Sequence, residues 1–244
     1  GTSNSVEVSA AAATKLTLNG AADTTIASLA TAGTDSLTEI NASGMTGGLT
    51  LTTGATDIGS ATLTVTGGAG GDTLDVSAAG TTVSVSAGAG DDTVTLGAGD
   101  NTVAGGAGSD ILSIGAAIDA NDTISGFESL TVTGAVDQDM DFLSNNTIAT
   151  VTDGVGGANA VAFSDASADV ATLVLSTADN TSSVTVDRKT DTSDDSLSIT
   201  LRDGDATAVT VNDEESLTID SSTAATTITT LNAADVTSIT ITAD

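Results

Sequence analysis

The stretch that decides the fold is AGAGDDTVTLGAGDNTVAGGAGSDILS, residues 87–113, which divides into three blocks of nine residues. A fourth block of the same kind, GGAGGDTLD, occupies residues 67–75. All four blocks carry glycine at the fourth place and an aliphatic residue at the eighth, and short repeats of this kind indicate stacked structural units. The sixth place carries an oxygen-bearing side chain in each block: Asp72, Asp92, Asn101 and Asp110.

Each block combines a six-residue turn with a three-residue strand. Glycine lets the turn adopt positive φ and direct its carbonyls inward, and the eighth residue then points into a narrow interior. Two blocks complete a coil of 18 residues, so equivalent turns lie one strand spacing, about 4.8 Å, apart. The spacing predicts a first edge that carries Asp72, Asp92 and Asp110, and a second edge that carries Thr81, Asn101 and Asp119.

Carboxylates stacked at this distance repel one another unless a hard cation lies between the turns. Calcium fits this role, because it accepts six to eight oxygen ligands and tolerates irregular geometry. We expect about two to four ions in the array, with Asp92 the most important ligand because it faces turns on both sides. The candidate ligands, counted as turn carbonyls or side-chain oxygens, are Gly67, Ala69, Gly70, Asp72, Ala87, Gly90, Asp92, Gly99, Asn101, Gly105, Gly108, Asp110, Asp119 and Asp122.

The rest of the chain alternates apolar and polar residues with period two, as in KLTLNG and SSVTVDR. Such alternation is typical of strands with one buried face, so the sequence predicts an all-β protein. Only AAIDANDTI and DFLSNNTIATV admit a single helical turn. We expect three regions, a flank at 1–66, a calcium-binding β-roll at 67–130 and a flank at 131–244. A continuous solenoid is predicted for both flanks, with a β-sandwich at 131–244 as the alternative.

Composition excludes several functions. The 244 residues include no cysteine, histidine, tryptophan, tyrosine or proline. Without histidine or cysteine there is no ordinary general base, thiolate or zinc site, and we therefore expect no enzyme within these residues. The net charge is −29, so nucleic acid and anionic membranes would be repelled. No apolar run is long enough to span a bilayer, no signal peptide is recognisable, and the start at GTSNS without methionine suggests an excised fragment.

The blocks GGAGGDTLD and GGAGSDILS resemble the repeats-in-toxin (RTX) nonapeptide, a calcium-binding β-helix unit. This resemblance implies a right-handed parallel β-roll with several Ca²⁺ ions in its turns, and export from Gram-negative bacteria by a type I system. The Thr-, Ala- and Gly-rich flanks resemble Gram-negative surface-layer (S-layer) proteins of this class.

The S-layer resemblance implies a secreted structural protein that self-assembles into a lattice on the cell surface. Its partners would be lattice neighbours and calcium, together with cell-surface polysaccharide bound through regions outside this chain. No nucleic acid and no membrane insertion are expected. The alternative is a calcium-stabilised secreted adhesin or a non-catalytic module of an RTX exoprotein.

A second acidic segment, RDGDATAVTVNDEESL, contains Asp203, Asp205, Asp213 and Glu214 around predicted turns. Carboxylates in this arrangement are compatible with a further calcium site. They are equally compatible with a solvated acidic turn, and the sequence leaves both interpretations open.

Overall fold

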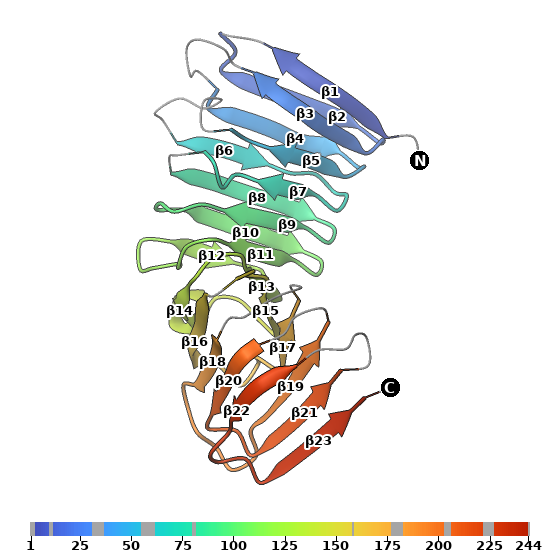
Figure 1. Ribbon diagram of the computed structural model, residues 1–244. Helices are drawn as coiled ribbons and strands as arrows, with labels where there is room; N and C mark the ends of the chain where they lie inside the picture. The colour runs from blue at the N-terminus through green and yellow to red at the C-terminus, as the bar shows by residue number, and fades with distance from the viewer. Residues whose placement is uncertain are drawn as a thin grey trace. The chain divides into compact units, whose positions relative to one another are not determined.

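The computed structural model is an all-β chain of stacked parallel coils, a β-solenoid (Figure 1). The structure describes residues 3–9, 12–30, 37–54, 62–79, 82–157, 159–176, 183–202, 206–221 and 227–243. Consecutive strands alternate between a 12-stranded sheet of odd-numbered strands and two sheets of even-numbered strands, one with six strands and one with five, so each coil contributes one odd-numbered and one even-numbered strand. The chain forms two compact units, unit 1 with residues 1–113 and 119–127, and unit 2 with residues 114–118 and 128–244.

Unit 1 holds the predicted repeats. Its odd-numbered strands form one sheet in chain order: β1 (Asn4–Ser9), β3 (Thr24–Ala30), β5 (Leu49–Thr52), β7 (Thr73–Asp75), β9 (Thr93–Leu96) and β11 (Ile111–Ile114). Its even-numbered strands form the other: β2 (Lys15–Gly20), β4 (Glu39–Met45), β6 (Leu63–Thr66), β8 (Val83–Ala89), β10 (Thr102–Ala107) and β12 (Thr123–Ser125). The register advances by one coil at each step, as in Ser84↔Thr102 between β8 and β10.

Unit 2 repeats the same arrangement of alternating strands. Its odd-numbered strands are β13 (Ser129–Val132), β15 (Thr150–Asp153), β17 (Thr172–Leu175), β19 (Ser196–Leu201), β21 (Ser216–Asp220) and β23 (Ser238–Thr242). Its even-numbered strands are β14 (Asp137–Asp139), β16 (Ala160–Ala166), β18 (Ser183–Arg188), β20 (Ala206–Asn212) and β22 (Ile228–Asn232). A short 3₁₀ helix, η1 (Met140–Leu143), lies between β14 and β15.

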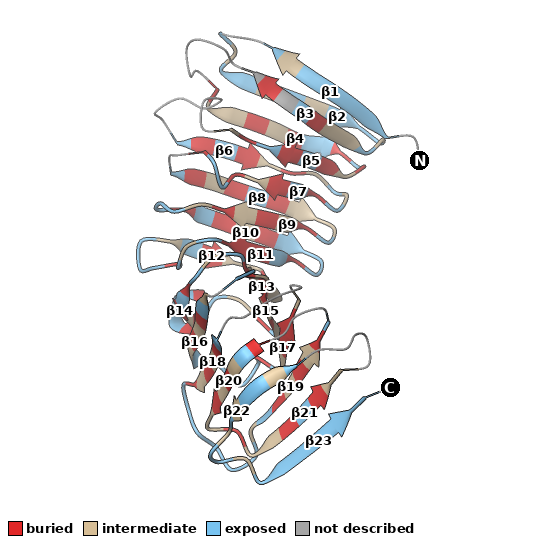
Figure 2. Cartoon of the chain, in the orientation of Figure 1, coloured by how far each residue is buried: buried red, intermediate tan, exposed pale blue. Residues whose placement is uncertain are grey.

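The interior is built by the period-two alternation. Except in the strands nearest the chain ends, β1, β2, β22 and β23, inward residues are buried and the residues between them face outward, which Figure 2 shows as alternating bands along the strands. The residues at the eighth place of the repeats, Leu74, Val94 and Leu112, are all fully buried. The narrow aliphatic interior predicted from the repeats is therefore present.

The predicted solenoid is confirmed in both flanks. A β-sandwich at 131–244 is wrong, because the strands of that fold are antiparallel, whereas the described strands of unit 2 pair in parallel. Of the two segments that admitted a helical turn, DFLSNNTIATV contributes to η1 and AAIDANDTI forms turns and the short strand β12. No helix among the described residues is long and apolar enough to cross a bilayer.

The turns of each solenoid lie on two edges. On the first edge the chain passes from an even-numbered to an odd-numbered strand, for example at residues 90–92 between β8 and β9. On the second edge it passes from an odd-numbered to an even-numbered strand, for example at residues 97–101 between β9 and β10. Asp72, Asp92 and Asp110 lie in three successive turns of the first edge, as the repeat spacing predicts.

We predict that Leu74→Ala destabilises the calcium-loaded protein by about 2–5 kcal/mol, because it leaves a cavity where a fully buried side chain stood. Urea unfolding followed by circular dichroism measures the loss. Thr73→Ala is the matched control, since Thr73 is the exposed neighbour in the same strand. Equal midpoints for the two variants would contradict the packing role of the eighth place.

Candidate metal centre

The aspartates of the first edge form a hydrogen-bonded ladder. Oδ1 of Asp110 accepts the backbone N–H of Asp92 at 2.9 Å, and Oδ1 of Asp92 accepts the N–H of Asp72 at 2.7 Å. Oδ1 of Asp72 accepts the N–H of Leu49, also at 2.7 Å. Each carboxylate therefore ties its own turn to the coil before it.

All three ladder carboxylates are buried, each with only 1% of its residue surface exposed. The second oxygen of Asp72 accepts the N–H of Gly68 at 2.8 Å. The second oxygen of Asp92 is buried without a hydrogen-bond partner. A buried carboxylate oxygen that lacks a donor is costly, so the middle of the ladder is where a cation would contribute most.

Glycine allows neighbouring turns to approach one another closely. A Cβ atom at Gly67 would lie 1.9 Å from the carbonyl oxygen of Ala87 and 2.4 Å from Oδ2 of Asp72. Gly108 has φ +145°, and a Cβ there would lie 2.0 Å from the carbonyl oxygen of Gly90. The absence of side chains at these positions brings carbonyl and carboxylate oxygens of successive coils together.

Repulsion between the ladder carboxylates adds to the free-energy cost of burying them. Burial, together with the neighbouring carboxylates of Asp72 and Asp110, raises the pKa of Asp92 to about 6. Burial also raises the pKa of Asp72. No lysine or arginine occurs between residues 16 and 187, so the coils that carry this ladder contain no basic side chain. Lys15 instead pairs with Glu39 at 2.6 Å, and its side chain is half exposed.

The second edge is built differently from the prediction. The N–H of Asn101 donates to Oδ1 of Asp122 at 2.8 Å, and β10 pairs with β12 so that Thr102 lies beside Thr123. Asp122, and not Asp119, therefore stacks on Asn101, because the intervening turn is three residues longer than the repeat. Asp119 is exposed and donates its N–H to Asp122. Thr81 lies outside the described residues.

The side chain of Asn101 satisfies its own turn. Its Nδ2 donates to the carbonyl oxygen of Gly99 at 2.7 Å, and its Oδ1 accepts the N–H of Val83 at 3.4 Å. This edge thus combines a neutral amide with Asp122, which is only half buried. The concentration of buried negative charge lies on the first edge alone among the described repeat turns.

The donor set of the first edge fits calcium. It offers carboxylate and carbonyl oxygens, an unpartnered buried oxygen on Asp92 and glycine cradles with no room for a side chain. Calcium prefers oxygen ligands and needs neither nitrogen nor sulfur, which this site does not offer. The residues present are therefore suited to the ion that the sequence predicted.

Comparison with known proteins agrees with this geometry. Residues 84–112 match a family model described as the RTX calcium-binding nonapeptide repeat (4 copies). No characterised protein and no solved structure matches the chain. The matched stretch contains Asp92, Asn101 and Asp110, and the structure places Asp72 on the same ladder outside it. The chain carries RTX repeats that bind Ca²⁺.

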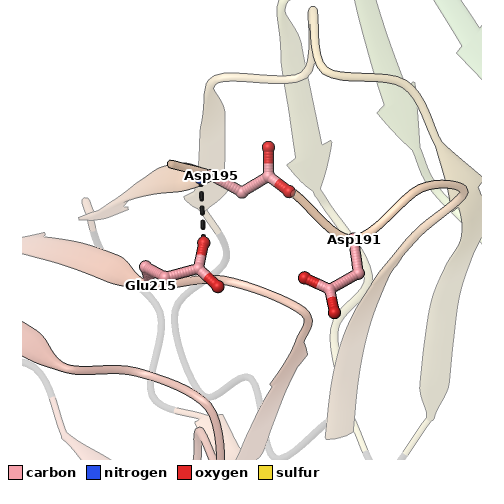
Figure 3. Close-up of side chains that lie close together, drawn as sticks. All are labelled: Asp191, Asp195 and Glu215. Atoms are coloured by element: carbon pink, nitrogen blue, oxygen red, sulfur yellow. Dashed lines mark hydrogen bonds between the residues drawn. The ribbon is translucent and has the colours of Figure 1, made fainter. Parts of the chain in front are cut away.

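A second group of oxygen donors lies in unit 2. Figure 3 shows the carboxylates of Asp191, Asp195 and Glu215 facing one another, and one oxygen of each lies within 4.8 Å of the others. The N–H of Asp195 donates to Glu215 at 2.9 Å, and its carboxylate accepts the N–H of Thr192 at 2.8 Å. Turn hydrogen bonds therefore account for part of this clustering.

In the second acidic segment, the structure gives Glu214 a different role from that of a turn ligand. Asp203 and Asp205 lie outside the described residues. Glu214 points into the interior and pairs with the buried Arg188, with 2.5 Å between Oε1 and Nε. Sequence reasoning missed this ion pair, although the alternation Val184, Val186, Arg188 in β18 already places Arg188 inward.

We predict that Asp92→Asn has two opposite effects. It lowers calcium affinity about tenfold, because affinity follows the number of charged ligands. It also makes the calcium-free protein more resistant to unfolding, because it removes a buried charge from the ladder. Asparagine keeps the acceptor for the N–H of Asp72, as Asn101 does on the other edge. Calorimetric titration and circular dichroism in EDTA measure the two effects.

The control is Asp100→Asn, which removes an exposed charge from the same repeat array. It should change neither quantity appreciably. If both variants lost affinity equally, the ladder would not be the calcium site.

We predict that the calcium-free protein loses β structure as pH rises through the interval between 3.8, the ordinary pKa of an aspartate, and about 6. A carboxyl group with a raised pKa in the folded chain binds more protons there than in the unfolded chain, so protonation stabilises the fold. Far-ultraviolet circular dichroism in EDTA across this interval measures the transition. With saturating calcium the β signal should persist at neutral pH, and a calcium-free protein equally folded at pH 4 and pH 7 would contradict the prediction.

Proposed function

We propose that this chain is part of a structural surface-layer protein that folds on calcium and self-assembles into a two-dimensional lattice on a bacterial cell. The observation that carries the proposal is the buried acidic ladder in a protein that is solenoid throughout its described length. The part of the chain that carries the ladder has a fixed shape only when the ladder charge is neutralised. A lattice protein requires a rigid, repeated surface and self-complementary contacts.

The proposed calcium ligands are those of the first edge. They comprise the carboxylates of Asp72, Asp92 and Asp110 and turn carbonyls at Gly67, Ala69, Gly70, Ala87, Gly90, Gly105 and Gly108. On the second edge, Asn101 with Gly99 and Asp122 form a weaker site, because the amide of Asn101 already satisfies the Gly99 carbonyl. Asp119 has a lesser role in this assignment, since it does not stack on Asn101.

Location and partners follow from the repeats and the charge. RTX repeat proteins are generally secreted, and we infer export by a type I system to the outer surface of a Gram-negative cell. A net charge of −29 makes neighbouring copies repel one another within a Debye length, roughly 10 Å at 0.1 M salt. Calcium that neutralises the carboxylates of the turns and bridges the surfaces of neighbouring copies would overcome that repulsion.

The second candidate is a calcium-stabilised adhesin or another non-catalytic module of an RTX exoprotein. One observation favours it, a cleft of about 220 Å³ in unit 2. Asp141, Asp165, Asp169 and Lys189 surround the cleft, and Met140 and Leu143 provide apolar surface within it. Polar groups around a small apolar surface are typical of ligand sites.

We predict that millimolar calcium, but not sodium at the same ionic strength, converts the purified protein from monomers into ordered sheets. Screening alone supplies no ligand geometry, so sodium reduces repulsion without fixing the shape of the first edge. Light scattering and negative-stain electron microscopy follow assembly.

Asp92→Asn should assemble only at higher calcium, and Asp100→Asn should assemble as the unaltered protein does. Calcium-loaded protein that is folded by circular dichroism yet stays monomeric at high concentration would overturn the lattice proposal and favour the adhesin.

A further inference from the structure

The first edge of unit 2 differs from that of unit 1 in its source of positive charge. The chain has four basic residues, Lys15, Arg188, Lys189 and Arg202. Two of them, Arg188 and Lys189, are adjacent at the end of β18, where the chain enters a first-edge turn. In unit 1 the equivalent turns carry Asp72, Asp92 and Asp110, with no basic side chain beside them.

Arg188 connects three successive first-edge turns of unit 2. Its Nε donates to Oε1 of Glu214 at 2.5 Å, in the turn between β20 and β21. One terminal nitrogen donates at 2.6 Å to the carbonyl oxygen of Ser167, in the turn after β16. The other donates at 3.3 Å to the carbonyl oxygen of Ser196, at the start of β19. A buried cation thus receives one carboxylate and two backbone carbonyls from stacked turns.

These partners, a carboxylate and backbone carbonyl oxygens, are the same kinds of ligand that the first edge of unit 1 offers to calcium. Glu214 is fully buried, as are the ladder aspartates, and burial raises its pKa while the bond to Arg188 lowers it. The charge of Arg188 also helps to lower the pKa of Asp195, after the larger effect of the hydrogen bonds from Thr192. Arg188 therefore offsets negative charge at two neighbouring turns.

Lys189 provides a second connection on the outside of the same edge. Its Nζ lies 2.6 Å from Oδ2 of Asp141, in η1. The carboxylates of Asp165 and Asp139 also favour its charged form. Both side chains of the pair are about half exposed, so this bridge contributes less than the buried one.

We propose that Arg188, assisted by Lys189, is the resident cation of the first edge in unit 2, so that unit 2 keeps its fold when calcium is withdrawn and unit 1 does not. Calcium then controls the structure of the repeat-bearing half of the chain only. The partly folded chain would retain the coils from β16 to β21.

Hydrogen–deuterium exchange with mass spectrometry tests the proposal on the full chain. In EDTA, amides of β7 to β11 should lose their protection, while amides of β16 to β21 keep theirs. In calcium both groups should be protected. Simultaneous loss of protection in both groups on chelation, or protection of both in EDTA, would overturn the proposal.

Substitution separates the role of Arg188 from a general effect of charge. Arg188→Met should abolish protection in β16 to β21 even in calcium, because it leaves Glu214 buried without a counter-charge. Arg202→Met is the matched control, since Arg202 is an exposed arginine in the same unit, and it should leave protection unchanged. Unchanged protection in Arg188→Met would overturn the proposal.

The double variant Arg188→Met with Glu214→Gln removes both buried charges. Protection in β16 to β21 should recover in part relative to Arg188→Met, because no unpaired carboxylate remains. Exchange as fast as in Arg188→Met alone would overturn the role of Arg188 as a counter-charge. The inference does not depend on the lattice, since exchange reports folding in a monomer and scattering reports assembly.

Discussion

Like charges stacked at the spacing of a β-sheet are the constraint on which this structure depends. Parallel coils repeat about every 4.8 Å, so equivalent turn residues form a column along each edge. On the first edge of unit 1 that column consists of buried carboxylates, Asp72, Asp92 and Asp110. Such a column is stable only when cations or protons neutralise its carboxylates. The strands on either side of these turns are therefore stable only under the same condition, because the turns connect them.

The ladder aspartates have two opposing effects on the stability of the fold. As acceptors of N–H groups from the preceding coil, they fix the register. A neutral amide is sufficient for this role, as Asn101 shows on the second edge. As buried anions they repel one another and raise the pKa of Asp92. With aspartate in place of asparagine, the fold therefore depends on neutralisation of the carboxylate, since the hydrogen bonds are retained only where its charge is balanced.

In unit 2 the chain itself supplies the cation that balances a buried carboxylate. The guanidinium of Arg188 bonds to Glu214 and to two backbone carbonyls on stacked turns. Arginine suits this position because its planar group presents several donors in fixed directions to separate acceptors. In the proposed arrangement the two units balance this charge with different cations, one taken from solution and one supplied by the chain.

The sequence by itself determined the parallel solenoid, the buried eighth-place residues such as Leu74, and the first-edge column of Asp72, Asp92 and Asp110. These features follow from local periodicities, which repeat every two or nine residues and require no knowledge of distant segments. Only the tertiary structure decided which residues stack where the coil length varies. Asp122 rather than Asp119 lies on Asn101, and Glu214 meets Arg188 26 residues earlier in the chain. The physical reason is that turns of unequal length can be accommodated outside the sheets, so strand register, and not sequence spacing, sets which side chains meet.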